Sequence, residues 1–264
     1  MLYYPQLATG SVSQYPIGRA MELRTISNQM PGGDSIRAAD PGAAVVRWQL
    51  EYGDLTDAEW TSIYQLFSAV EGQLGTFTFL DPTDNLLLWS EDWTQKVWSA
   101  DPLIAVGNGV ADPMGGSNGM RITNNAQTTQ RIMQATAGPS WFQYSFSVFL
   151  KSDVSCTVQL VLSAAGQDWL DPVNVGTNWG RLACSTALST TQDGVTFGVQ
   201  LPAGVRIYAF GAQVEPQPGP GPYKRTTDLG GVYASTRFNS DTLLRTTLGP
   251  NQNSTVVKLV SNLL

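Results

Sequence analysis

The stretch from residue 45 to residue 82 reads VVRWQLEYGDLTDAEWTSIYQLFSAVEGQLGTFTFLDP, and it decides the fold. Its first eight residues alternate, and one face carries Val46, Trp48, Leu50 and Tyr52. A period of two is typical of a strand with one buried face. The sequence therefore predicts a strand over 45–52.

A short helix is predicted directly after this strand. Thr56 and Glu59 have the spacing of a capping box, in which the Thr56 hydroxyl accepts from the Glu59 amide and the Glu59 carboxylate reaches back. Apolar residues then recur at helical spacing: Trp60, Ile63, Tyr64, Phe67 and Val70. Gly72 is the expected stop, and an aromatic strand follows over 76–80.

This unit of strand, helix and strand is too small to bury its aromatic residues alone. Suitable partner strands appear only near the C-terminus, at 231–239, 242–247 and 254–260. We therefore expect a split domain made of residues 1–83 and 228–264, with residues 84–227 inserted as a second domain. Loop-closure entropy grows slowly with length, so such an insertion costs little.

The inserted segment contains short strands separated by turns. They are expected at 119–124, 131–135, 141–151, 156–163, 179–185, 194–201 and 205–214. Short strands at about ten-residue spacing without a helical pattern predict a β-sandwich of jelly-roll type. The expected fold class is therefore mainly β: an α+β outer domain with one short helix, plus the inserted sandwich. Residues 215–222, rich in proline and glycine, are expected to form a stiff, extended, protease-sensitive exit linker.

Residues 28–42 are predicted to form a loop, because MPGGD (30–34) and AADPG (38–42) are rich in turn formers. The loop is longer than a usual connection. Two interpretations stay open: the mobile tip of a hairpin, or an arm that becomes ordered against a neighbouring subunit. The residues assigned to this arm are Asn28, Pro31, Gly33, Asp34, Asp40 and Pro41.

Composition argues against several functions. The chain has 264 residues and a net charge of −6, so no nucleic-acid-binding surface is expected. There is no run of about 18 apolar residues and no signal-peptide pattern, so neither a membrane span nor secretion is expected. The two cysteines, Cys156 and Cys184, are expected to be free thiols, with a bridge formed later as the alternative.

The sequence contains no histidine, which removes Ser-His-Asp and Cys-His catalysis and the usual ligands of catalytic zinc. Glycoside hydrolysis needs two carboxylates about 5–10 Å apart. The acidic residues Glu91, Asp92, Asp168 and Asp171 are better explained as solvated loop charges. We therefore expect no enzymatic activity. A structural Ca²⁺ is the one cofactor considered, with ligands drawn from Glu91, Asp92 and Asp171.

Sugar binding needs exposed aromatic rings beside polar side chains, because the apolar faces of sugars stack on flat rings. The candidates are Trp169, Trp141, Trp98 and Trp179. Trp169 is the first choice, because turn-forming residues surround it in GQDWLDP (166–172). A core position is the alternative for each ring, and the insert could instead serve as a spacer or a docking surface for fibres.

The two ends of the insert resemble a known frame. Asn85-Leu86-Leu87 with Trp89–Trp93, and Phe210–Pro216 with Pro222-Tyr223, resemble the NLL-x-x-SEDF … WGAQLE-x-G … SYIPT frame of carbohydrate-binding-type jelly rolls in bacteriophage tail and fibre proteins. The stretch YSFSVFLK (144–151) is similar to the strand YTFSVYVKA of that family. The closing IPT of the frame is replaced here by Lys-Arg-Thr-Thr at 224–227.

The split outer domain resembles the distal tail, or minor tail, proteins of long-tailed phages. The matching segments are Trp48–Tyr52, Glu59–Val70, Gly75–Pro82, Arg237–Arg245 and Val256–Val260. This resemblance implies a structural virion protein of the tail tip or baseplate, made in the host cytoplasm. Such proteins form a homo-oligomeric ring, usually of six copies, that joins the tail tube to the hub and fibre proteins and lets DNA pass. The alternatives are a receptor-binding or fibre protein whose jelly roll binds host glycans, and a tail-associated glycan hydrolase.

Overall fold

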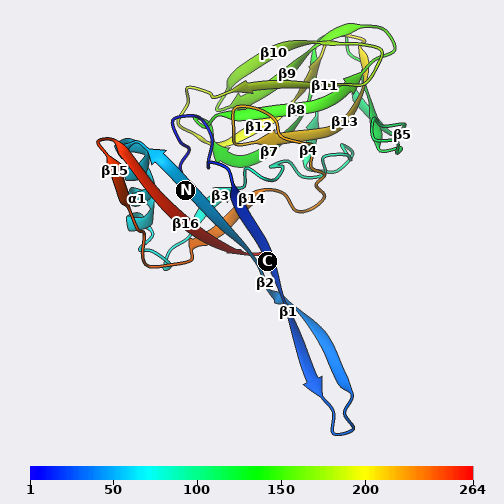
Figure 1. Cartoon of the computed structure of the whole chain (residues 1–264). Coiled ribbons are helices and arrows are strands. Elements are labelled where there is room, and N and C mark those ends of the chain that lie inside the picture. Colours follow the sequence, from blue (N-terminus) through cyan, green and yellow to red (C-terminus); the bar gives the residue numbers. More distant parts are fainter. Residues whose placement is uncertain (264) are drawn as a thin grey trace. The chain divides into compact units, whose positions relative to one another are not determined.

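The computed structural model describes residues 1–263, and the chain divides into two compact units. Unit 1 consists of Met1–Ala8, Ser13–Phe79 and the residues from Tyr233 onward, and unit 2 consists of Thr9–Val12 and Leu80–Val232. Most of the described residues lie in strands, and α1 is the one α-helix among them (Figure 1). The predicted fold class, mainly β with one short helix, is confirmed. None of the described helical residues forms a segment long and apolar enough to cross a membrane.

Unit 1 is built on a sheet in which the N-terminal and C-terminal parts of the chain pair with each other. Its strand order is β1-β2-β16-β14-β3, and β15 pairs with β16. Antiparallel pairing of β16 with β2 places Leu259 opposite Trp48 and Val257 opposite Leu50. The strands are β1 Ile17–Gln29, β2 Ser35–Leu55, β3 Phe77–Leu80, β14 Val232–Phe238, β15 Thr246–Gly249 and β16 Gln252–Asn262.

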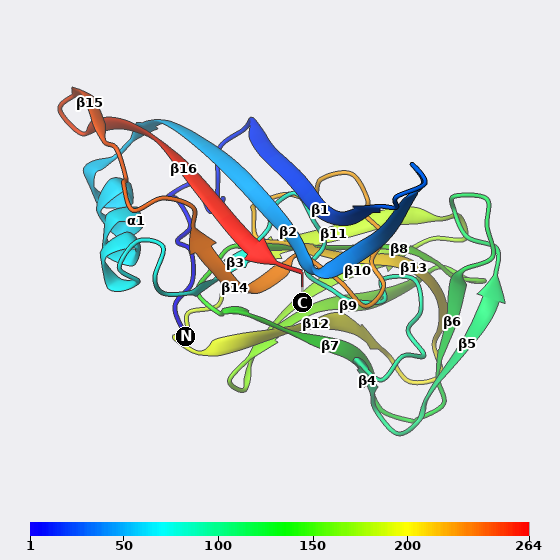
Figure 2. The ribbon, with the colours of Figure 1, turned by 90° about the horizontal axis from the view of Figure 1, so that it is seen from below.

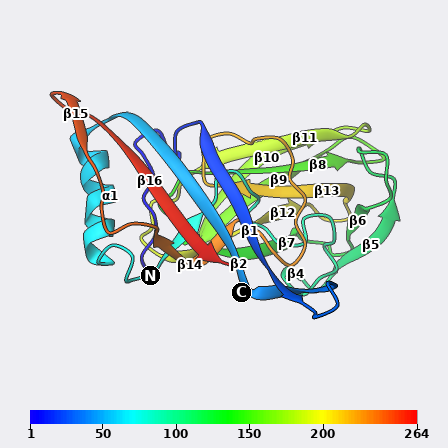
Figure 3. The same cartoon turned by 60° about the horizontal axis from the view of Figure 1, so that its bottom comes forward.

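Helix α1 (Asp57–Ala69) begins where the capping box predicts. The Glu59 amide donates to Thr56 Oγ1 (3.2 Å), and the Thr56 amide donates to Glu59 Oε2 (2.9 Å). The helix buries Trp60, Ile63 and Leu66 and lies beside β2 and β16 (Figure 3). Tyr64, which the sequence places on the apolar stripe, is half exposed, and its ring stacks on that of Trp60 with 6.1 Å between centroids.

Aromatic rings fill the core of unit 1. Trp48 meets Phe79 at 5.0 Å and Tyr233 at 4.6 Å between ring centroids, both edge to face. Phe238 meets Phe67 and Phe77, each at 5.1 Å. Such pairs contribute about 0.5–1.5 kcal/mol each beyond the area that they bury. These contacts join β2, α1 and β3 to β14, so segments from both parts of the chain share one core.

The predicted loop at residues 28–42 is wrong over most of its length. β1 and β2 form one antiparallel hairpin, and the chain turns only over Met30–Asp34, where the Met30 amide donates to the Asp34 carbonyl (2.7 Å). Asp40 and Pro41 lie in β2, at the point where its register with β1 shifts. Proline is tolerated at such a bulge because the ladder is interrupted there. Figure 1 shows the hairpin extending well beyond the other strands of its sheet.

Unit 2 is a sandwich of two five-stranded sheets, with orders β10-β9-β12-β7-β4 and β11-β8-β13-β6-β5. The inward faces are apolar, and Val158, Leu160 and Leu162 of β9 are almost fully buried. In Figure 2, β5 and β6 run side by side at one edge of the unit. The strands are β4 Trp98–Ala100, β5 Ile104–Val110, β6 Gly119–Asn124, β7 Gln130–Pro139, β8 Tyr144–Lys151, β9 Cys156–Ala164, β10 Gln167–Val175, β11 Gly180–Thr186, β12 Asp193–Leu201 and β13 Arg206–Glu215.

Strand β10 occupies a segment in which the sequence predicts turn residues. It contains Asp168, Asp171 and Pro172, which are residue types depleted in strands. The strand forms nonetheless because it is an edge strand, paired only with β9, so Pro172 needs no partner on its outer side. Strands β4 and β5 also lie outside the predicted set.

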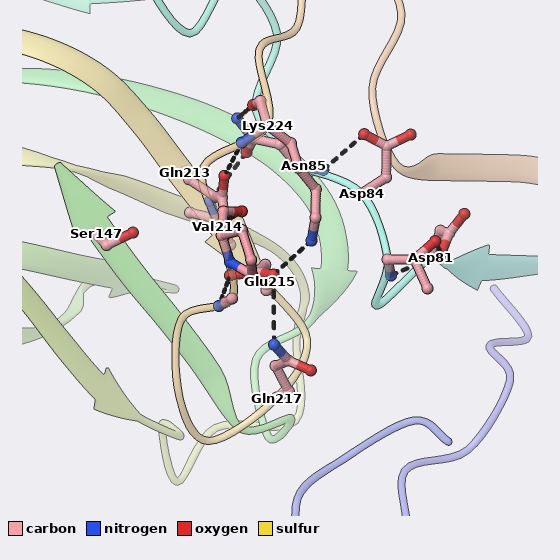
Figure 4. Close-up of polar contacts among 12 residues, drawn as sticks. Asp81, Asp84, Asn85, Ser147, Gln213, Val214, Glu215, Gln217 and Lys224 are labelled. Carbon is pink, nitrogen blue, oxygen red and sulfur yellow. Dashed lines mark hydrogen bonds and ion pairs between the residues drawn. The ribbon is translucent and has the colours of Figure 1, made fainter. Parts of the chain in front are cut away.

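The predicted extended exit linker is also wrong, because residues 215–222 fold back around a buried carboxylate. Glu215 is fully buried, and its side chain accepts hydrogen bonds from the Gly221 amide (2.8 Å) and from Gln213 Nε2 (2.8 Å). Lys224 Nζ completes an ion pair at 2.8 Å, and Gln217 donates from 3.3 Å (Figure 4). A buried charge is tolerated only when it is paired and hydrogen-bonded. The carboxylate therefore organises the prolines and glycines into a fixed loop.

Thr56→Ala is expected to lower the free energy of unfolding of unit 1 by about 1 kcal/mol, because it removes the hydroxyl that caps α1. Chemical denaturation of the full chain measures the change. Thr61→Ala removes the same atoms from an exposed position inside the helix and should change stability by less than about 0.5 kcal/mol. Equal losses in the two variants would contradict a capping role.

Glu215→Ala is expected to destabilise unit 2 by about 3 kcal/mol, because Lys224 and the donors around the carboxylate lose their partner. Limited proteolysis should find residues 215–222 resistant in the wild type and cleaved in the variant. Asp153→Ala, which removes an exposed carboxylate from the same unit, is the control and should leave resistance unchanged. Cleavage of the wild-type segment at the same rate would show that the carboxylate does not fix it.

Candidate functional site

The arm candidates of unit 1 all lie on the β1–β2 hairpin. Asn28 pairs with Ile36 near the tip, and Pro31, Gly33 and Asp34 form the turn. Asp40 is in β2 and forms an ion pair with Arg24 across the hairpin. The structure therefore places these residues on one ribbon rather than in a loop.

The hairpin exposes an unusual number of large apolar side chains. Leu23 is 73% exposed and Met21 is 60% exposed. Ile26, Met30 and Ile36 are also exposed, and every residue from 21 to 39 is solvent-accessible. A two-stranded ribbon has little stability of its own in water, and clustered apolar exposure marks an interaction surface. The hairpin is therefore the candidate contact surface of unit 1.

The four candidate stacking tryptophans of unit 2 have different surroundings. Trp98 is buried and stacks on Trp93 with 4.3 Å between centroids, so it is a core residue and not a platform. Trp179 is half-buried, and the Lys151 ammonium lies 5.1 Å from its ring. Trp141 and Trp169 are 47% and 46% exposed. Trp169 lies within β10, opposite Leu162, and not in the predicted turn.

The acidic candidates do not gather at one place. Glu91 and Asp92 line a cleft of unit 2, whereas Asp168 and Asp171 belong to β10 and are absent from its lining. Asp168 accepts a hydrogen bond from Ser163 and pairs with Arg131 at 2.8 Å, and these contacts lower its pKa. No group of three His, Cys, Asp or Glu residues within residues 1–263 is arranged to hold a metal ion. The candidate Ca²⁺ ligands Glu91, Asp92 and Asp171 thus form no common site.

The cleft has a volume of about 450 Å³. Its walls come from the segment that precedes β4, from β5, from the turn before β6 and from the segment after Tyr223. The lining residues are Trp89, Glu91, Asp92, Asn108, Gly109, Ser117, Asn118, Met120, Arg225, Thr226 and Thr227.

Three side chains hold Glu91 in the cleft. Its Oε1 accepts from the Tyr223 hydroxyl (3.0 Å), and its Oε2 accepts from Asn118 Nδ2 (3.0 Å) and lies 3.2 Å from Arg225 Nε. Burial and the nearby Glu91 carboxylate raise the pKa of Tyr223, so this hydroxyl stays protonated as a donor. The side chain of Glu91 is 10% exposed and that of Arg225 is 63% exposed, so the guanidinium faces solvent.

Asp112 fixes the turn that presents Asn118. Its carboxylate accepts from the amides of Met114 (2.8 Å), Gly116 (3.0 Å) and Asn118 (3.0 Å). Burial alone would raise the pKa of Asp112, but these donated hydrogen bonds outweigh it and lower the pKa. The turn is therefore held by an ionised carboxylate at neutral pH.

Trp89 has an unusual backbone for a bulky residue, with φ of 49°. This left-handed conformation costs about 1–3 kcal/mol and persists only where the surroundings hold it. Here the Trp89 amide donates to the Thr227 carbonyl (2.8 Å), and the Trp98 indole donates to the Trp89 carbonyl (3.2 Å). These two hydrogen bonds hold the backbone of Trp89, which lines the cleft.

The Asp92 carboxylate of the cleft is held by donors from its own loop. Burial alone would raise the pKa of Asp92, but donors from Gln95 and Thr94 lower it. Sequence reasoning named Glu91 and Asp92 but missed the partners Asn118 and Arg225, which no local pattern connects to them.

No family model matches the chain, and no curated protein matches it. Among solved structures, it is similar to a CBM22 xylan-binding domain from Paenibacillus barcinonensis, with 12% identity, a TM-score of 0.41, and 52% of this chain and 97% of that one covered. It is also similar to the xylan-binding domain from CBM 22, with 18% identity and a TM-score of 0.43. This match covers 53% of this chain and 99% of that one. A third similar structure is the enzymatically active domain of tailspike protein 4 of bacteriophage CBA120, with 12% identity and a TM-score of 0.37. This match covers 52% of this chain and 22% of that one. The similar structures thus include carbohydrate-binding domains and one phage tailspike.

Asp112→Asn is expected to lower the free energy of unfolding at pH 7 by about 1 kcal/mol, because a neutral amide is a weaker acceptor for the three amides. The folded-state pKa of Asp112 lies below the unfolded value of about 3.9. Its contribution is therefore complete above that pH and is lost as the pH falls through the folded-state pKa. Denaturant titrations from pH 7 to pH 2 should show the two proteins converging in acid. A difference in the free energy of unfolding between the two proteins that stays constant from pH 7 to pH 2 would contradict this prediction.

Proposed function

We propose that this chain is a structural component of a phage tail tip, in which unit 1 assembles copies of the chain into a ring. The observation that carries the proposal is the β1–β2 hairpin, whose apolar side chains Met21, Leu23 and Ile26 have no core to enter within unit 1. The resemblance of the outer domain to distal tail proteins supports the same role. The ring would connect the tail tube to the hub and fibre proteins.

One open edge of the unit 1 sheet also favours assembly. At one edge, β3 is covered by the N-terminal segment, because the Tyr4 amide donates to the Thr78 carbonyl and the Thr78 amide donates to the Leu2 carbonyl, each at 2.9 Å. At the other edge, β1 ends the sheet. The β1 edge is therefore open to another copy, and where it meets a different surface of that copy the interface is heterologous and closes into a ring when the rotation permits. A net charge of −6 is compatible with DNA passing through without being held.

Glycan binding by unit 2 is the second candidate function. Two observations favour it: the indoles of Trp141 and Trp169 are about half exposed, and the cleft beside Glu91 presents fixed polar groups. The frame around Asn85 and Glu215 also resembles carbohydrate-binding-type jelly rolls of phage tail and fibre proteins. In this role the tail tip would contact host surface glycans. Catalysis is not part of the proposal.

Removing the hairpin should abolish the ring without unfolding unit 1. Replacing residues 23–44 by Asn-Gly joins Glu22 to Val45, which already face each other in the ladder, through a two-residue hairpin turn. Light scattering and negative-stain images should show rings for the wild type and single copies for the variant, with similar thermal unfolding of unit 1.

A point change provides a matched comparison. Ile26→Asp on the hairpin should weaken assembly at least tenfold, whereas Val154→Asp, at an exposed position of unit 2, should not. A wild-type protein that stays a single copy at high concentration and is absent from tails would reject the ring.

A further inference from the structure

We propose that the cleft bounded by Trp89, Asn118 and Arg225 binds uncharged sugar units. This inference rests on the glycan-binding function proposed for unit 2 and names its site and ligand class. The exposed rings of Trp141 and Trp169 are not part of the cleft lining. The binding site would therefore differ from the one that the sequence suggests.

The composition of the cleft suits a polyhydroxylated ligand. Its volume of about 450 Å³ lies within the range of small-molecule sites. Trp89 is a partly exposed aromatic residue of the lining, and the amides of Asn108 and Asn118 supply both donors and acceptors. A sugar ring presents the same combination, with an apolar face and hydroxyls at its rim.

The charges of the cleft select against other ligand classes. A phosphate or a carboxylate would meet Glu91 and Asp92, while the one cation in the lining, Arg225, is already paired with Glu91. A metal ion would find no third acidic ligand among the lining residues, and the Arg225 guanidinium lies against Glu91 Oε2. A neutral hydroxylated ligand meets neither obstacle.

Glu91 and Arg225 together can hold neighbouring hydroxyl groups. A carboxylate offers about four acceptor positions, and Tyr223, Asn118 and Arg225 use three of those on Glu91. One position remains for a hydroxyl donor. The exposed guanidinium can donate to the next hydroxyl oxygen, so a pair of adjacent hydroxyls would be recognised by geometry.

The cleft walls are fixed before any ligand arrives. Asp112 holds the turn that carries Asn118, and Tyr223 holds Glu91. The backbone of Trp89 is held at a φ of 49°, and strain of this kind in non-glycine residues clusters at functional sites. A rigid site loses less entropy on binding, which favours a weakly interacting ligand such as a sugar.

The test uses the full chain on an array of neutral, acidic and amino glycans. Neutral glycans should bind, and the strongest should be titrated as free oligosaccharides by calorimetry. Arg225→Ala and Asn118→Ala should each weaken binding at least tenfold, or 1.4 kcal/mol. Arg206→Ala removes another exposed arginine of unit 2, side chain 53% exposed, and should leave the affinity unchanged. Both cleft changes remove exposed side chains, and thermal unfolding checks that the variants fold.

Three results would overturn the inference. Neutral-glycan binding that survives both cleft changes but is lost in Trp169→Ala would reject the site and keep glycan binding. Binding confined to acidic glycans or to inorganic phosphate would reject the ligand class. Absence of binding to every glycan would reject this site together with the glycan-binding function, whereas the ring, judged by mass and images, would be unaffected.

Discussion

The pairing of β16 with β2 is the constraint on which unit 1 depends. Because side chains alternate along a strand, a slip by one residue would turn Leu259 and Val257 away from the face that holds Trp48 and Leu50. The two segments come from opposite parts of the chain, so the core forms only after the long intervening segment allows them to meet. That segment leaves and returns at adjacent points, since the Asp81 amide donates to the Gly231 carbonyl at 2.8 Å. The insertion therefore places little strain on the ends that it separates.

Local signals in the sequence predict much of unit 1. The alternation over 45–52 and the capping box at Thr56 depend on neighbouring residues, and both appear in the structure. The error over 28–42 has a physical cause, because Asp40 and Pro41 are turn formers that also suit a bulge between paired strands. Composition cannot separate the two cases, since only the partner strand β1 decides between them. The sequence does not predict β10 for the same reason, because its pairing with β9 decides that this segment is a strand.

The residues of the frame, at the two ends of the insert, are joined by hydrogen bonds. Asn85 Oδ1 accepts from the Val214 amide (3.0 Å), and Asn85 Nδ2 donates to the Ala212 carbonyl (2.9 Å). Glu215, next in the chain, fixes the loop that follows β13 (Figure 4). These buried polar groups tie the first and last segments of unit 2 together, which is why they are recognisable as paired motifs. Asn118 and Arg225 of the cleft belong to no such pattern, because only the folded chain brings them to Glu91.

The surfaces of the two units differ in chemistry, and this difference suits them to different kinds of partner. The hairpin of unit 1 offers exposed apolar side chains such as Leu23 and Ile26, and burying such side chains under a protein surface is favourable. The cleft of unit 2 offers polar groups that are already hydrogen-bonded and cannot be covered by an apolar partner without losing solvent. The hairpin therefore fits the assembly role proposed for unit 1, and the cleft fits the ligand-binding role proposed for unit 2.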